Sequence, residues 1–257
     1  MKKLLLLGGT ADARRMTKAL LEKNGEQKQQ LQIVYSVAGL VRTPELPCEV
    51  LVGGFSQFGG LATYICNQKI DAILDVTHPF AATMSSTAVS VAKDLGIPCW
   101  RFHRPEWQQQ PGDNWRLFDD WQTLIPALAG KKSVLLTAGQ LTQGAVDQLV
   151  AQTGDDQRII LRTAAPPRVD LPDSVEWIKG IGPFRLEDER VLFEQYEVDA
   201  LVTKNSGGAS TEAKLHAARE LGVEVFMLQR PELPDADQQF SDIAEGVVVI
   251  RDWMTNE

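Results

Sequence analysis

The sequence contains few cysteines and no long hydrophobic run. The three cysteines among its 257 residues, Cys48, Cys66 and Cys99, are scattered, without a Cys-x-x-Cys pair or a histidine at ligand spacing. This pattern favours small core residues in a reducing compartment, so we expect no metal site. No apolar stretch reaches the roughly 18 to 20 residues that cross a bilayer, and the run Leu4–Leu7 ends at Gly8 without a signal-peptide cleavage site. We therefore expect a cytoplasmic protein that binds no membrane.

Positive charge and tyrosine are also scarce. The 26 Lys and Arg residues face 34 Asp and Glu residues, which gives a formal net charge of −8, and no Lys/Arg-rich run is present. This balance argues against binding to nucleic acid. None of the three tyrosines is followed by a lysine four positions later. The Tyr-x-x-x-Lys pair expected of a short-chain dehydrogenase or a nucleotide-sugar epimerase is therefore absent from the sequence.

What is present is an alternation of short apolar runs and amphipathic segments, typical of βαβ units around a parallel sheet. In the first half the pattern predicts strands at Lys3–Leu7, Gln32–Ser36, Glu49–Val52, Ala72–Asp75 and Pro98–Arg101, and helices at Ala11–Lys23, Phe58–Gln68 and Ala81–Leu95. In the second half it predicts strands at Ser133–Thr137, Arg158–Leu161, Val175–Ile178, Ala200–Thr203 and Glu224–Leu228, and helices at Trp121–Leu128, Thr142–Gln152, Leu186–Tyr196 and Thr211–Leu221. The segment Phe240–Met254 is predicted as a closing helix, although Val247–Ile250 could equally form a strand.

A repeat indicates two equivalent halves. Leu95–Glu106 aligns without gaps on Leu221–Glu232, and both copies end in Arg-Pro-Glu. We therefore predict an α/β protein of two Rossmann-like parallel-sheet domains, with the active site in the cleft between them. The expected boundaries are residues 1–103 for the N-terminal dinucleotide-binding domain, 104–131 for a connector, and 132–257 for the C-terminal domain.

The first segment suited to chemistry follows the first strand. Gly8, Gly9 and Thr10 connect a buried run to a helix start, where glycine permits close approach of a phosphate and free N–H groups attract anions. A plain tight turn remains the alternative, because the full G-x-G-x-x-G pattern is absent. After the second strand no carboxylate occurs before Glu45, whereas Ser36 and Arg42 suit a 2′-phosphate. This favours NADPH, with NADH possible.

Two further segments follow predicted strands, at whose carboxyl ends parallel sheets bind ligands. The segment Thr77–Phe80 includes Pro79, which stiffens the turn, and His78, which could donate a proton or merely cap local backbone. The segment Lys204–Gly208 brings a cation, amide groups and two glycines to a helix start, with Lys214 on that helix, and favours an anion site. Lesser candidates are Gly53–Phe55 and Thr137–Gln140.

Together these segments resemble one family, the precorrin-6A reductases of cobalamin biosynthesis, including the cobalt-precorrin-6A form. The matching pieces run in family order across nearly the whole chain: Gly8-Gly9-Thr10 with Arg14, Ser36 with Ala38-Gly39, Gly53-Gly54-Phe55, Asp75 with Thr77–Ala81, Arg104-Pro105 with Trp107, Gly182-Pro183-Phe184, Thr203–Gly208 with Lys214, and Arg230-Pro231. The chain departs from the pattern at Leu40, where the family commonly has arginine, so that Arg42 would have to replace it or the enzyme would prefer NADH.

The resemblance implies a two-domain reductase, expected to be a monomer, that uses a nicotinamide cofactor to reduce one ring double bond of its tetrapyrrole substrate. It assigns the cofactor to Gly8, Gly9, Thr10, Ser36, Ala38, Gly39, Arg42, Thr77, Pro79 and Phe80. We expect His78 and Lys204 to orient ligands or donate a proton. The substrate carries many carboxylates, and we expect Arg104, Asn205, Ser206, Gly207, Gly208 and Arg230 to bind it. A two-lobed nucleotide- or tetrapyrrole-binding module without catalysis remains the alternative.

Overall fold

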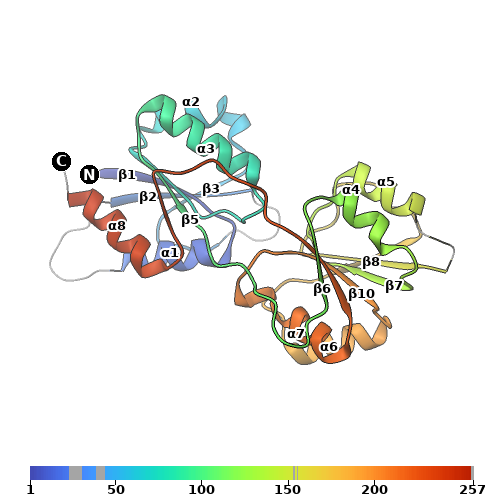
Figure 1. Ribbon diagram of the computed structural model, residues 1–257. Coiled ribbons are helices and arrows are strands. Elements are labelled where there is room, and N and C mark those ends of the chain that lie inside the picture. The colour runs from blue at the N-terminus through green and yellow to red at the C-terminus, as the bar shows by residue number, and fades with distance from the viewer. Residues whose placement is uncertain (23–30, 39–43, 153, 155, 256–257) are drawn as a thin grey trace. The chain divides into compact units, whose positions relative to one another are not determined.

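The computed structural model describes residues 1–22, 31–38, 44–152, 154 and 156–255. The chain forms two compact units, Met1–Pro105 with Glu232–Glu257 as unit 1 and Glu106–Pro231 as unit 2 (Figure 1). The predicted boundaries are therefore corrected. The last 26 residues, 232–257, return to the first unit, and residues 106–131 are part of the second unit rather than a connector.

Unit 1 is a six-stranded parallel sheet in the order β12-β5-β4-β1-β2-β3. Its strands are β1 (Lys2–Leu7), β2 (Leu31–Val37), β3 (Glu49–Val52), β4 (Ala72–Asp75), β5 (Cys99–Phe102) and β12 (Gln238–Phe240). Its helices are α1 (Ala11–Leu21), η1 (Phe55–Phe58), α2 (Leu61–Gln68), α3 (Ala82–Leu95) and α8 (Ile243–Thr255). Strand order reverses between β1 and β4, as in dinucleotide-binding sheets.

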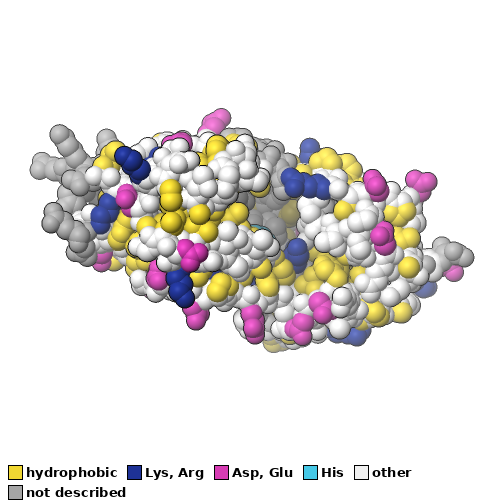
Figure 2. All heavy atoms as spheres, turned by 90° about the horizontal axis from the view of Figure 1, so that it is seen from above, with side chains coloured by type: hydrophobic (Ala, Val, Ile, Leu, Met, Phe, Trp, Pro, Cys, Tyr) yellow, Lys and Arg dark blue, Asp and Glu magenta, His cyan; other side chains and the backbone are white. Residues whose placement is uncertain are grey.

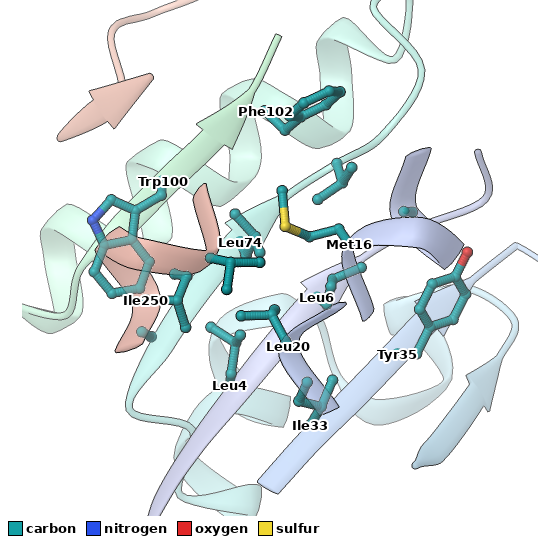
Figure 3. Close-up of a cluster of buried hydrophobic side chains, with 14 of the residues drawn as sticks. Leu4, Leu6, Met16, Leu20, Ile33, Tyr35, Leu74, Trp100, Phe102 and Ile250 are labelled. Carbon is teal, nitrogen blue, oxygen red and sulfur yellow. The ribbon is translucent and has the colours of Figure 1, made fainter. Parts of the chain in front are cut away.

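The apolar run of β1, Leu4–Leu7, is continuous because the strand is buried on both faces of the sheet. Successive side chains of a strand point to opposite faces, so a strand covered on both faces is apolar throughout. Leu4 and Leu6 belong to the cluster beneath α1 and α8 (Figure 3), and Leu5 and Leu7 to the cluster beneath α2 and α3. Tyr35 of β2 lies in the first cluster with its hydroxyl at the margin (Figure 3).

Unit 2 repeats this arrangement with the strand order β6-β11-β10-β7-β8-β9, again all parallel. Its strands are β6 (Trp115–Phe118), β7 (Ser133–Leu136), β8 (Arg158–Thr163), β9 (Val175–Lys179), β10 (Ala200–Lys204) and β11 (Glu224–Leu228). Its helices are α4 (Trp121–Leu124), η2 (Ile125–Leu128), α5 (Gln143–Gln152), α6 (Leu186–Gln195), η3 (Ala209–Thr211) and α7 (Ala213–Leu221).

The predicted equivalence of the two halves is confirmed in detail. The repeated segments both contain a glycine that ends a helix in the left-handed conformation, Gly96 after α3 and Gly222 after α7. Asp71 accepts the backbone N–H of Lys3 at the start of the central strand, and Asp199 accepts that of Ser133 at the equivalent place. The two Arg-Pro-Glu triplets fall where the chain passes from one unit to the other.

The sixth strand of each sheet was not predicted. β6 follows the first Arg-Pro-Glu triplet and pairs with β11, whereas β12 follows the second triplet and pairs with β5. The two halves thus exchange their sixth strands. Both are short edge strands, and a strand of this kind needs little apolar sequence because only one edge is paired. The closing helix is confirmed over Ile243–Thr255, but Phe240 belongs to β12.

Candidate functional site

The turn after β1 is shaped by Gly8 and Gly9. The N–H of Gly8 donates to the carbonyl of Ser36 at 2.8 Å, and the N–H of Gly9 donates to the Tyr35 hydroxyl at 2.9 Å. A β-carbon on Gly8 would lie 2.6 Å from that hydroxyl oxygen, and Gly9 has φ of +102°. Both positions therefore require glycine, one for close packing and the other for its backbone conformation.

Thr10 connects this turn to the end of β4. As the N-cap of α1, its hydroxyl oxygen accepts the N–H of Ala13 at 3.0 Å and donates to the carbonyl of Val76 at 2.9 Å. The Thr10 side chain is thus used for structure. What the turn can offer an anion is the positive end of α1, whose first N–H groups have no acceptor within the helix.

The turn after β4 is held by the buried carboxylate of Asp75. One of its oxygens accepts the N–H and the hydroxyl of Thr77, at 3.1 and 2.7 Å. The other accepts Nε of the buried Arg101 at 3.3 Å, and Arg101 also donates to the carbonyl of Pro234 at 2.8 Å. Pro234 precedes β12, so Arg101 also fixes the returning segment against the sheet.

His78 lies in the same turn and is exposed. Its Nδ1 accepts the N–H of Phe80 at 3.2 Å, and the two rings lie 5.8 Å apart between centroids. The local backbone contact considered as an alternative for His78 is therefore present. It also places the proton of the neutral ring on Nε2, because Nδ1 is the acceptor.

Among the other residues predicted for the cofactor, Ser36 is buried at the end of β2 and Ala38 is exposed. Gly39 and Arg42 lie outside the described residues. Arg104 lies in unit 1 and donates to Asp12 in the first turn of α1 at 2.6 Å. Unit 1 thus brings together Gly8–Thr10, Thr77–Phe80 and Arg104 at the carboxyl edge of its sheet.

In unit 2, Asn205 follows β10 and is buried. Its carboxamide accepts the N–H of Trp107 at 3.0 Å and donates to the carbonyl of Trp107 at 3.4 Å. Its backbone N–H donates to Leu228 at 2.8 Å, and its carbonyl accepts Nε of Arg230 at 2.8 Å. Asn205 therefore holds Trp107 and Arg230, which lie next to the two places where the chain passes between the units. The sequence predicted that Asn205 contacts substrate and did not predict this positioning role.

The rest of this turn contains a buried serine and two glycines with positive φ. Ser206 is buried, and its N–H donates to the carbonyl of Lys204 at 2.7 Å. Gly207 and Gly208 have φ of +62° and +90°. The side chain of Lys204 is half-buried, and burial lowers its pKa below the usual value.

The sequence placed Lys214 with the anion site of the Lys204–Gly208 turn, but the pairing of Arg162 with Glu189 in the same unit was not predicted. Arg162 of β8 donates two hydrogen bonds to Glu189 of α6, at 2.7 and 3.1 Å, and both side chains are buried. Lys214 is buried on α7 with its Nζ 5.3 Å from the centre of the Trp107 ring. Lys214 shares the buried face of α7 with Leu215 and Ala218, so its helical position was the sequence signal for its burial.

Two kinds of site are not found in the part of the chain that the structure describes. No group of three or more His, Cys, Asp or Glu side chains there is placed to hold a metal ion. No helix there is long and apolar enough to span a membrane. On the face shown in Figure 2, acidic and basic side chains are interspersed.

The protein belongs to the class of two-domain Rossmann-like α/β proteins. Both of its parallel sheets have the strand order of dinucleotide-binding sheets, and both have glycine turns at their carboxyl edges. Over residues 3–251 the sequence matches the family described as precorrin-6x reductase CbiJ/CobK. The precorrin-6A reductase of Rhodococcus erythropolis is 39% identical over 251 residues, covering 96% of each chain. The cobalt-precorrin-6A reductase of Priestia megaterium is 31% identical, covering 90% of this chain and 91% of its own.

A solved structure described as CobK precorrin-6A reductase is similar in fold, with a TM-score of 0.84 and 32% identity, and covers 98% of this chain and 97% of its own. The chain belongs to the precorrin-6x reductase family, whose members are oxidoreductases of cobalamin biosynthesis.

Proposed function

We propose that the protein reduces one ring double bond of precorrin-6A, or of its cobalt form, with NADPH as the preferred hydride donor. The observation that carries the proposal is the turn Gly8–Thr10 at the point where the strand order of unit 1 reverses, in a chain of this family. Relatives named precorrin-6A reductase are 32 to 39% identical and those named cobalt-precorrin-6A reductase 23 to 31%. This difference favours the metal-free substrate.

The residues of unit 1 fit a dinucleotide. Gly8 leaves room for Tyr35 beneath the turn, and Gly9 adopts a positive φ that favours glycine. The positive end of α1 points towards the carboxyl edge of the sheet. The buried Ser36 lies at the end of the neighbouring strand, where the adenosine ribose of a dinucleotide is bound in this topology. We assign the pyrophosphate to the turn and the adenosine to the end of β2.

When bound, the cofactor supplies the hydride, so the protein has to orient two ligands and exclude water. The Asp75 carboxylate holds Thr77, and thereby the turn that carries His78, in one conformation. The Phe80 N–H leaves Nε2 of His78 as the ring's donor, which suits a hydrogen bond to a ligand. In unit 2, Lys204 and the glycine turn suit carboxylates of the substrate.

Mixing the protein with precorrin-6A and reduced cofactor should oxidise the cofactor and yield the dihydro product. NADPH should bind about ten- to a hundredfold more tightly than NADH, because a charge-assisted hydrogen bond from Arg42 to the 2′-phosphate would contribute about 1.5 to 3 kcal/mol. The measurement is the fall in reduced-nicotinamide absorbance, with both cofactors and with both substrate forms. Arg42→Ala should remove the difference between cofactors. Binding of both ligands without turnover would instead support a binding module.

Lys204→Ala should lower kcat/KM for precorrin-6A about tenfold or more, since losing a charged contact to a ligand costs about 1.5 to 3 kcal/mol. Lys132→Ala is the matched control, because Lys132 is an exposed lysine at the opposite end of the same sheet. Steady-state kinetics of both variants test this role, and equal kcat/KM in the two would show that Lys204 does not contact the substrate.

A further inference from the structure

Lys214 is a buried cation that the proposed hydride transfer does not use. It is 4% exposed and lies on the same face of α7 as Leu215 and Ala218. Within the described ranges no hydrogen-bond acceptor or carboxylate contacts its Nζ, whose near neighbour is the Trp107 ring. A cation–π contact replaces only part of the hydration that an ammonium group loses on burial.

The charges that face Lys214 do not balance. They are Arg162 from β8 and Glu189 from α6, and both carboxylate oxygens of Glu189 already accept hydrogen bonds from Arg162. At the start of α7, the half-buried Glu212 and His216 face each other, with His216 Nε2 3.9 Å from Glu212 Oε1. Burial, and then the charge of Arg162, lower the pKa of Lys214 to about 7, whereas Glu189 raises it. When Lys214 is protonated, two buried cations face one carboxylate.

The cluster lies beside the glycine turn of unit 2. The Arg162 guanidinium lies 4.3 Å from the centre of the Phe184 ring, and the Phe184 N–H donates to the carbonyl of Ser210 at 3.1 Å. Ser210 lies between Gly208 and the start of α7. Arg162, near the end of β8, thus shares the carboxyl edge of the sheet with this loop, where parallel sheets bind ligands.

We propose that Lys214 and Arg162 together bind one carboxylate of the tetrapyrrole substrate, and that the Lys214 amine takes up a proton from solvent when this carboxylate binds. The inference rests on the proposed function, which supplies a substrate with carboxylates. A cofactor phosphate has the same oxyanion chemistry, so NADP⁺ is tested separately.

The proposal predicts how substrate affinity changes with pH. Below pH 7 the amine is already protonated, and affinity should not depend on its titration. Above pH 7 the amine has to gain a proton on binding, so KM for precorrin-6A should rise by up to about tenfold per pH unit until the pKa of the complex is reached. An amine that stays neutral when substrate binds would give no such rise.

Kinetics of three variants between pH 6 and 8.5 test this prediction. Lys214→Met should raise KM for precorrin-6A about tenfold at pH 6.5 and abolish its pH dependence, with kcat within about threefold of the native value. Lys214→Arg should keep a low KM but lose the pH dependence, because arginine stays protonated. Lys132→Met is the control and should behave as the native protein. A native KM profile in Lys214→Met would overturn the proposal.

A second measurement does not depend on turnover. In protein labelled with ¹³C at lysine Cε, the Lys214 signal is the one missing from the Lys214→Met spectrum. Its titration should move up by one pH unit or more with precorrin-6A and stay unchanged with NADP⁺. A shift with NADP⁺ alone, or with neither ligand, would overturn the carboxylate assignment. If the native protein binds precorrin-6A without reducing it, the proposed function fails, whereas the titration still decides the inference.

Discussion

Replacing Glu189 by glutamine is expected to lower the free energy of unfolding by about 3 to 5 kcal/mol, because it leaves a buried charge without its partner. The isosteric change keeps the packing of α6 but removes the one carboxylate, among the residues that the structure describes, that pairs with Arg162. The pKa of Lys214 should also fall below its value of about 7, since Glu189 raises it. Denaturant unfolding at pH 7 measures the first effect.

Two further variants make this test specific. Glu187→Gln, an exposed carboxylate on the same helix, should change the free energy of unfolding by less than about 0.5 kcal/mol. Below the pKa of Lys214, where the amine is protonated, adding Lys214→Met to Glu189→Gln should recover part of the loss, because it removes one of the two buried cations. Equal stability of Glu189→Gln and Glu187→Gln would contradict the buried pair.

Gly8→Ala is expected to destabilise the protein by about 1 to 3 kcal/mol or more, since overpacking a filled core has this cost. Its β-carbon would lie 2.6 and 2.7 Å from the hydroxyl oxygen and Cε2 of Tyr35, which is fully buried. Displacing Tyr35 should also remove the acceptor of the Gly9 N–H and weaken NADPH binding. Thermal unfolding and cofactor titration measure the two effects.

The neighbouring glycine provides the comparison. A β-carbon on Gly9 has room among the protein atoms, with Val37 3.9 Å away, so the effect of Gly9→Ala on stability should be only the strain of its positive φ. Replacing the Tyr35 ring by the smaller side chain of valine (Tyr35→Val) in the Gly8→Ala background should restore part of the stability that Gly8→Ala loses. No recovery in the double variant would mean that the clash with Tyr35 is not the cause.

Much of the candidate site could be predicted, but the roles of several residues could not. The turns after β1, β4 and β10 were predicted because each follows a buried strand, and ligand-binding residues of parallel sheets gather there. Asn205 was expected to contact substrate, yet its carboxamide holds the Trp107 backbone, 98 positions earlier in the chain. The hydroxyl of Thr10 likewise binds Val76 rather than remaining available to a phosphate. No local sequence pattern predicts hydrogen-bond partners that lie so far away in the chain.

The sequence by itself determined the order of strands and helices, the parallel sheets and the duplication. These follow from local periodicity, from glycines such as Gly96 and Gly222 at helix ends, and from the repeated Arg-Pro-Glu triplets. The tertiary structure alone decided that β6 and β12 are exchanged, because edge strands carry little apolar signal and pair with strands more than a hundred residues away. It also decided that Lys214 lies near the Arg162–Glu189 pair, because the elements that pack over the buried face of α7 come from distant parts of the sequence.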